Sequence, residues 1–265
     1  MGSWKVSWVK DYVFSKEVYS KNTQVLKSPL SFYFAVFLKL FPGLYNKPVR
    51  FHLKNGGSFL CPDFMSVYIY WEIFLFKVYD YQASSKEEIT ILDVGANIGL
   101  STIHFKQRFP LAEVLCFEPF KKNYDYLNLN IQSSNFQNIK TFQLGVAGEK
   151  RHSLLYIHKK NSGAHSIYPE ELSLGSVEIE LISLQDALNL TKTGKCDILK
   201  LDCEGAEYEI IKSITPVMTA KIKQIYYEAT VTRYDPKELN DHLASIGYEV
   251  NLVDGYVYSA KRIER

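Results

Sequence analysis

The 265 residues carry 31 Lys and Arg against 29 Asp and Glu, and 46% of them are hydrophobic. This length and apolar content suit one large α/β domain, alone or with a small N-terminal cap. The formal net charge of +2 and the lack of a Lys/Arg-rich run argue against a nucleic-acid partner.

The N-terminal 47 residues give the weakest pattern. Trp4, Trp8 and Tyr12 recur every four residues, which predicts an amphipathic helix. The run 30–44 is strongly apolar and aromatic but too short to span a bilayer. We expect it to be a helix packed on the main domain. A membrane-surface or partner-binding helix is the alternative.

A β-hairpin and an aromatic helix are predicted next. Residues 49–53 and 58–61 flank an Asn-Gly turn, the strongest short signal for a hairpin. Residues 64–81 are then expected to form one helix whose stripe of Tyr68, Trp71, Leu75 and Val78 lies in the core. Glu72 interrupts that apolar helix, and a solvated acid is favoured over a ligand contact there.

A polar break at residues 84–88 marks the best boundary between structural units. We therefore predict an N-terminal helical and hairpin cap over residues 1–85 and a main domain over residues 86–265. The four cysteines show no metal-binding or redox spacing, which favours free thiols in a reducing cytosol. No secretory signal with a cleavage site is recognisable, so a cytoplasmic location is expected.

Strands and helices alternate from residue 89 onward, as in an open, mostly parallel sheet with helices on both faces. The first unit reads ITILDVGANIGLST: a short apolar strand, then Asp93, a turn of small residues and a helix. We expect the turn to offer backbone N–H groups at the positive helix end to an anionic or polar ligand group. Gly95 and Gly99 would permit close approach of the main chain or a positive φ.

The second unit places an acid where a nucleoside would need one. The strand 113–117 is followed by Glu118, whose carboxylate can accept both hydroxyls of a ribose. A helix-capping acid is the alternative for this residue. Asn97 breaks the Gly-x-Gly-x-x-Gly spacing of dinucleotide-binding turns. The two units together therefore predict a nucleoside site of another kind.

The remaining elements add further features to the same sheet edge. The strand 139–144 leads to Gly145 and Val146, which would let an adenine ring lie flat, although an ordinary glycine turn fits almost as well. Residues 153–157 and 177–181 are predicted antiparallel strands around a polar loop that contains His165. A strand over 222–227 and a hairpin formed by 247–250 and 256–259 complete the predicted fold.

Three carboxylates follow the strand 197–201. Asp202 ends that strand, and residues 203–207, with Glu204 and Glu207, are expected to open a helix. Helix capping is the plain explanation for such acids. Clustered carboxylates that face a cleft would raise one another's pKa, which suits a general base. A Mg²⁺ site is a further alternative, and we predict none.

Two of these segments carry a family resemblance. DVGANIGLST followed by CFEPF resembles the first two cofactor motifs of class I S-adenosylmethionine-dependent methyltransferases. DILKLDCEGAEYEII, residues 197–211, is similar to the hallmark segment of the FkbM family within that class. The resemblance runs from roughly residue 48 to 262. It implies a Rossmann-like, mostly parallel seven-stranded sheet and an O-methyltransferase acting on a hydroxyl of a sugar, glycoconjugate or secondary metabolite.

The resemblance also implies site residues and partners. The acceptor would be a small molecule or glycan, the cofactor S-adenosyl-L-methionine, and membrane association is possible but not favoured. The residues 161–166 are similar to a family loop that lies near the acceptor. The catalytic candidates are Asp202, Glu204 and His165. The cofactor-binding candidates are Asp93, Gly95, Ala96, Asn97, Gly99, Ser101, Glu118, Pro119, Phe120, Gly145, Val146 and Glu72.

One departure and two alternatives accompany this reading. Many relatives have a histidine shortly after the acid at position 228, where this chain has Ala229 and Thr230, which weakens the case for a base at that edge. A catalytically inactive nucleoside- or glycan-binding module would explain the same turn and acids. A dinucleotide-dependent oxidoreductase is disfavoured by the glycine spacing. The sequence does not predict an oligomeric state.

Overall fold

The computed structural model describes residues 12–41, 43–79, 81–82, 84–159, 163–169 and 172–263. Its centre is a seven-stranded sheet in which all neighbours are parallel except those of β12, which runs antiparallel to both of its partners. In spatial order the strands are β11 (Tyr248–Asp254), β12 (Val257–Arg262), β10 (Ile222–Glu228), β9 (Cys196–Leu201), β3 (Thr90–Val94), β4 (Glu113–Phe117) and β5 (Ile139–Phe142).

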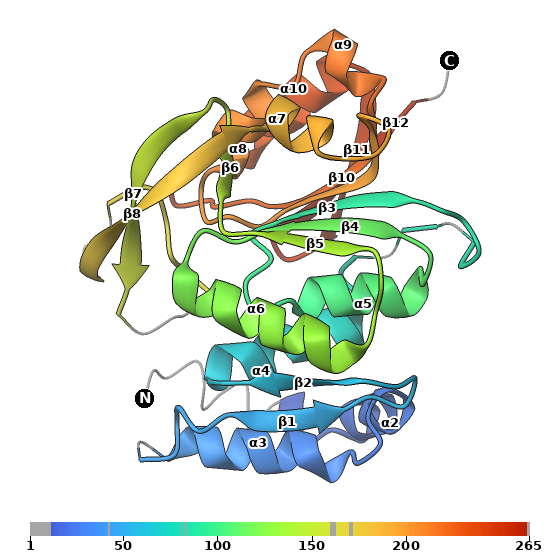
Figure 1. Ribbon diagram of the computed structural model, residues 1–265, viewed down its shortest axis with the longest axis vertical. Helices are drawn as coiled ribbons and strands as arrows, with labels where there is room; N and C mark the ends of the chain where they lie inside the picture. Colours follow the sequence, from blue (N-terminus) through green and yellow to red (C-terminus); the bar gives the residue numbers. More distant parts are fainter. Residues whose placement is uncertain are drawn as a thin grey trace.

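Helices cover both faces of this sheet (Figure 1). On one face lie α5 (Leu100–Arg108) and α6 (Lys121–Ser134), and on the other α7 (Leu184–Asn189), α8 (Glu207–Lys212), α9 (Pro216–Thr219) and α10 (Pro236–Ser245). Successive side chains of a strand point to opposite faces. Thus Ile91 belongs to the core beneath α5, and Leu92 to the core beneath α8. The predicted fold class is confirmed.

A separate, smaller sheet follows β5 in the chain. It consists of β6 (Gly145–Ala147), β8 (Ser173–Ser183) and β7 (Arg151–His158), with β8 in the middle, parallel to β6 and antiparallel to β7. The antiparallel pair predicted from residues 153–157 and 177–181 is confirmed, and both strands are longer than expected. The hairpin predicted near the C-terminus is also confirmed as β11 and β12.

The N-terminal elements form a layer below α5 and α6 (Figure 1). They are α2 (Lys16–Val25), α3 (Leu30–Leu40), the hairpin β1 (Val49–His52) and β2 (Ser58–Cys61), α4 (Phe64–Tyr70) and the π-helix η2 (Trp71–Phe76). The predicted hairpin is confirmed. The helix expected around Trp4 and Trp8 lies outside the described residues.

The helix predicted over residues 64–81 is shorter and less regular than expected. Its α-helical part is α4, the chain then widens into the π-helix η2, and Lys77 ends it with a left-handed φ of 55°. Leu75 and Val78 are buried, as the stripe predicted, but Tyr68 and Trp71 are only half-buried and line a cavity. The assignment of the whole stripe to the core was therefore wrong.

The N-terminal layer and the main sheet share one hydrophobic core. Phe51 and Tyr70 belong to the same buried cluster as Ile103 and Leu127 of the sheet-covering helices. The side chain of Asn130 also ties the layers together, because its Oδ1 accepts the Leu60 N–H at 2.7 Å and its Nδ2 donates to the Ile98 carbonyl at 2.8 Å. A boundary at residue 85 stays a prediction.

Candidate active site

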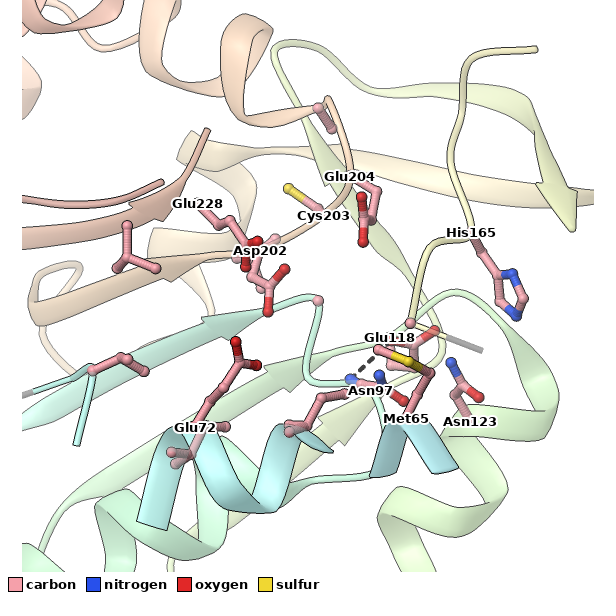
Figure 2. Close-up of a pocket in the computed structure, with 18 of the residues that line it drawn as sticks. Met65, Glu72, Asn97, Glu118, Asn123, His165, Asp202, Cys203, Glu204 and Glu228 are labelled. Carbon is pink, nitrogen blue, oxygen red and sulfur yellow. Dashed lines mark hydrogen bonds between the residues drawn. The ribbon is translucent and has the colours of Figure 1, made fainter. Parts of the chain in front are cut away.

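A cavity of about 620 Å³ opens at the carboxyl ends of β3, β4, β9 and β10. Ligands in open α/β sheets bind at this edge, because the loops there diverge. The α4 and η2 segment forms the opposite wall, and the turn between β11 and β12 closes one side. Figure 2 shows labelled side chains from the strand ends and from the α4 and η2 segment converging on the same space.

The glycine turn after β3 does not present its N–H groups to this cavity. The Gly95 and Ala96 N–H groups donate to the Phe117 carbonyl at 3.0 Å, the Asn97 N–H donates to the Glu118 carboxylate at 2.9 Å, and the Gly99 N–H donates to the Ala96 carbonyl at 2.8 Å. The prediction that these groups await an anionic ligand was therefore wrong for all four. The N–H groups of Gly95, Ala96 and Asn97 join the turn to the end of β4, and that of Gly99 closes the turn on itself.

The glycines are required by packing against protein. Gly95 and Gly99 have φ of 73° and 89°, which confirms the positive φ. A Cβ on Gly95 would lie 1.8 Å from the Asp202 carbonyl oxygen, and one on Gly99 would lie 2.7 Å from the Leu127 side chain. Because these two positions carry no side chain, the turn can pass closely beneath the end of β9 and pack against α6.

Asp93 and Lys200 form a buried support beneath the turn. Asp93 is fully buried and accepts hydrogen bonds from the hydroxyls of Ser101 and Thr102, each at 2.6 Å. The Lys200 Nζ lies 3.3 Å from Asp93 and 3.4 Å from the Asp202 carboxylate, and it donates to the Gly95 carbonyl at 2.8 Å. Burial lowers the pKa of Lys200, but the two carboxylates outweigh it and raise the pKa, so the ammonium persists. Lys200 thereby holds the ends of β3 and β9 together.

Glu118 lies in the cavity wall directly after β4. Its two carboxylate oxygens accept the N–H groups of Asn97 and Phe120, both at 2.9 Å. Burial raises the pKa of Glu118 to about 7, although these two hydrogen bonds oppose the shift. The remaining lone pairs of the carboxylate stay available to hydroxyl donors in the cavity.

The segment after β9 is a tight turn and not the start of a helix, which corrects the prediction. Glu204 and Gly205 adopt φ of 55° and 113°, and α8 begins at Glu207. The fully buried Glu207 carboxylate organises the turn, since it accepts the Cys203 N–H at 2.5 Å and the Gly205 N–H at 2.6 Å. Asp202 and Glu204 consequently lie ahead of the helix and line the cavity, so capping explains neither.

Asp202 and three other carboxyl groups from distant parts of the chain line the same region of the cavity. Figure 2 shows Glu72 pointing from its helix toward Asp202, with Glu228 at the end of β10 beside it. Asp254 of β11 lines the same cavity. Burial raises the pKa of Glu72 to about 8, with smaller contributions from Asp202 and Asp254. The Asp202 charge, and secondly burial, raise the pKa of Glu228 to about 8. Glu72 is therefore a cavity residue and not the solvated acid favoured from the sequence.

His165 lies at the opposite end of the cavity, edge-on to the Phe120 ring at 4.5 Å. Burial, aided by the nearby His158 and Lys122, lowers the pKa of His165 to about 4, so its imidazole is neutral. Its Nδ1 accepts the His158 N–H at 3.1 Å, which leaves the proton on Nε2. This tautomer is a donor and suits holding an acceptor oxygen better than removing a proton.

The structure separates the candidate residues into two groups. Those that line the cavity are Glu72, Gly95, Asn97, Glu118, Pro119, Gly145, Val146, His165, Asp202 and Glu204. Asp93, Ala96, Gly99 and Ser101 are buried behind it, and the half-buried Phe120 contacts the lining residue His165. Gly145 and Val146 lie beside Pro119 and Leu181 in the apolar part of the wall.

Sequence reasoning missed several cavity residues. Tyr68 hydrogen-bonds Glu72, and Met65 and Asn123 line the wall near Glu118 (Figure 2). Glu228 was discounted because no histidine follows it, yet it adjoins Asp202. An acid at the carboxyl end of a parallel strand was the signal that could have found it. No group of three His, Cys, Asp or Glu suited to a metal ion occurs within the described ranges.

A seven-stranded sheet in which only β12 runs antiparallel to its neighbours, with a cavity at the carboxyl ends of its parallel strands, is the class I methyltransferase fold. The comparisons with known proteins give the family. The model of the methyltransferase FkbM domain matches residues 93–250, and the chain belongs to this family.

Three relatives illustrate the range of similarity. Methyltransferase 1 of Beauveria bassiana is 24% identical over 69% of this chain and 81% of that protein. Methyltransferase sdnD of Sordaria araneosa is 30% identical over 56% of this chain and 68% of that protein. The crystal structure of methyltransferase FkbM from Methylobacillus flagellatus shares the fold with a TM-score of 0.52 and 15% identity. It covers 97% of this chain, which spans 60% of that longer protein.

The cofactor of this methyltransferase is S-adenosyl-L-methionine, and the chemistry of the cavity fits it. The Glu118 carboxylate in the cavity wall is of a kind that suits ribose hydroxyls, and the apolar wall around Val146 and Pro119 suits an aromatic base. Acidic rather than basic side chains line the region between Glu72 and Glu228, and a positively charged group there would favour the ionised forms of both. The cavity volume also lies in the range of pockets that enclose ligands of this size.

Proposed function

We propose that the protein transfers the methyl group of S-adenosylmethionine to a hydroxyl of a sugar, glycoconjugate or secondary metabolite. The observation that carries the proposal is the order of three neighbouring strand ends. Glu118 follows β4, the glycine turn follows β3, and Asp202 follows β9, and all three face one cavity. Bound S-adenosylmethionine would supply an electrophilic methyl group on a sulfonium centre.

The residues of the chain then have separate tasks. Glu118 would hold the ribose, and the wall at Gly145 and Val146 would receive the adenine. Asp202 would accept the hydrogen bond of the attacking hydroxyl, orient its oxygen and take up its proton. The Lys200 ammonium, 3.4 Å away, fixes the position of the Asp202 carboxylate for this task.

The surrounding acids support proton removal and acceptor binding. Glu72 and Glu228, with pKa values raised to about 8, can exchange protons with the site near neutral pH. Glu204 and the neutral His165 line the part of the cavity beyond Asp202, where hydroxyl-rich acceptors would find hydrogen-bonding partners.

Calorimetric binding followed by product analysis tests this function. We expect S-adenosylmethionine to bind and a nicotinamide dinucleotide not to bind. With a panel of sugars and hydroxylated metabolites, S-adenosylhomocysteine should form together with an O-methyl product identified by NMR. Preferential dinucleotide binding would contradict the methyltransferase assignment, and a methyl group on nitrogen, carbon or sulfur would contradict the hydroxyl acceptor.

A further inference from the structure

The α3 helix has two apolar faces, and only one of them is used inside the protein. Phe32, Ala35 and Val36 are buried, and α3 packs on β1 and α4 of the N-terminal layer, whereas the sequence predicted packing on the main domain. A second stripe lies outward at spacings of four, three and four residues, which places its members on one side of the helix. It consists of Leu30, Phe34, Phe37 and Phe41, which are 68%, 56%, 55% and 46% exposed.

The single charged residue of α3 does not interrupt this outward stripe. Lys39 is fully buried, and its Nζ donates to the carbonyls of Lys47 and Pro62, the latter at 2.8 Å. A lysine side chain could reach solvent from most helix positions, but this one is turned inward and satisfied there. The outer side of α3 is therefore uncharged along its length.

The apolar surface continues from α3 onto the start of α2. Phe14 and Tyr19 are 69% and 50% exposed, and both stack on Tyr33 with ring centroids 5.7 and 6.3 Å apart. These rings, with Leu30 and Lys16, line a groove of about 410 Å³ between the two helices. Together with the α3 stripe they make up what we call the aromatic face: Phe14, Tyr19, Leu30, Tyr33, Phe34, Phe37 and Phe41. In Figure 1, α3 forms the outermost layer of the protein.

Basic side chains predominate around the aromatic face, although the exposed Glu17 lies beside Lys16 and pairs with Lys21 at 2.8 Å. No Asp or Glu occurs between Glu17 and Asp63, whereas that interval contains six basic residues: Lys21, Lys27, Lys39, Lys47, Arg50 and Lys54. Lys27 and Lys47 are exposed just before and just after α3, and the exposed Lys16 lines the groove. In a chain with a net charge of only +2, this concentration leaves the rest of the sequence acidic.

We propose that the aromatic face binds the surface of an anionic lipid bilayer. Exposed phenylalanine and tyrosine rings enter the boundary between headgroups and acyl chains, and lysines at the edges pair with lipid phosphates. No described helix is long and apolar enough to cross a membrane, so the contact is peripheral. The lysines around the aromatic face favour an anionic bilayer as its partner, because such a surface is negatively charged. The proposal is independent of the methyl acceptor.

Vesicle flotation of the full-length protein tests the proposal. We expect binding to vesicles of equal parts phosphatidylcholine and phosphatidylglycerol, weaker binding to phosphatidylcholine alone, and release by high salt. The double variant Phe34→Ser/Phe37→Ser should bind at least about tenfold more weakly while its melting temperature is kept, because both rings are exposed. The matched control Val217→Ser/Leu252→Ser removes residues that are 76% and 60% exposed elsewhere, and it should bind as the parent does.

Charge-reversal variants distinguish electrostatic attraction to anionic lipid from non-specific hydrophobic adsorption. Lys27→Glu/Lys47→Glu should reduce binding to the anionic vesicles and its salt dependence, whereas Lys192→Glu/Lys195→Glu, also exposed, should change neither. Failure of the full-length protein to bind anionic vesicles would overturn the proposal. So would equal losses in the control variants. A dimer abolished by Phe34→Ser/Phe37→Ser, without vesicle binding, would instead show that the face joins two copies of the chain.

Discussion

Glu118 connects the glycine turn, the start of α6 and the cavity through one carboxyl group. Glu118→Ala should weaken S-adenosylmethionine binding by about 1–3 kcal/mol, the usual loss for hydrogen bonds to a charged group. Because the pKa of Glu118 is raised to about 7, cofactor affinity should fall as the pH is lowered through 7 and the carboxylate becomes protonated. Calorimetry between pH 6 and 8 measures both effects. An unchanged affinity in a folded Ala variant would remove Glu118 from the site.

Asp202 is the residue on which the chemistry of the proposed function depends. The loss of a general base typically slows turnover by about 10²–10⁴-fold. Asp202→Asn should show a loss of that order with little change in cofactor affinity, since Asn keeps the shape and part of the hydrogen bonding. Single-turnover kinetics and calorimetry give the two quantities. Full turnover by the Asn variant would contradict the catalytic role. Helix capping is not an alternative role for Asp202, because α8 begins only at Glu207.

At the scale of elements, the turn between β9 and α8 depends on one buried side chain. Glu207→Gln replaces an acceptor oxygen with an NH₂ group that faces a backbone N–H, so it should cost about 1–3 kcal/mol of stability. Glu209→Gln is the matched control, because Glu209 is part-exposed and pairs with Arg151 at 2.8 Å. Such pairs contribute at most about 1 kcal/mol. Thermal unfolding should thus separate the variants. Equal melting temperatures would contradict the organising role of Glu207.

The α4 and η2 segment supplies the pH-sensitive wall of the cavity. The pKa of Glu72 is about 8 in the folded protein and lies near 4.5 in the unfolded chain. The folded state therefore binds the additional proton. The contribution of Glu72 to the stability of the folded state is therefore fully present below pH 4.5 and is lost as the pH rises through 8. Glu72→Gln, which is always neutral, should reduce the decline in melting temperature between pH 6 and 9. An identical decline in both proteins would contradict the buried environment of Glu72.

For the whole molecule, the shared core predicts how the protein unfolds. Phe32 of α3 is fully buried and lies 5.8 Å from Tyr70, within the cluster that also contains Ile103 of α5. Phe32→Ala should therefore destabilise the entire protein by about 3–5 kcal/mol in a single transition. Calorimetry with separate probes for the N-terminal layer and the sheet checks this. Two transitions, with only one shifted, would show that residues 1–85 fold as an independent unit.

Local pattern was enough to determine the units of the fold. The strand–turn–helix at β3 and α5, the acids after β4 and β9, and the hairpin near the C-terminus all depend on residues close together in the sequence. Their apolar periodicity and turn residues therefore predicted them. The same local reasoning failed where the backbone conformation or its hydrogen bonds depend on a group elsewhere in the chain. The turn at Gly95 gives its N–H groups to β4, and α8 starts late because the Glu207 carboxylate folds the preceding turn.

The tertiary structure alone decided which side chains meet. Glu72, Asp202 and Glu228 come from three elements separated by long stretches of sequence, and no periodicity relates them. Their proximity, and hence the raised pKa values of Glu72 and Glu228, follows from strand order and from the packing of the α4 and η2 segment across the sheet edge. Likewise the sequence identified the residues 30–44 as strongly apolar, but only packing decided that Phe32 faces the core and Phe34 faces solvent. Burial depends on the surface that the rest of the chain presents.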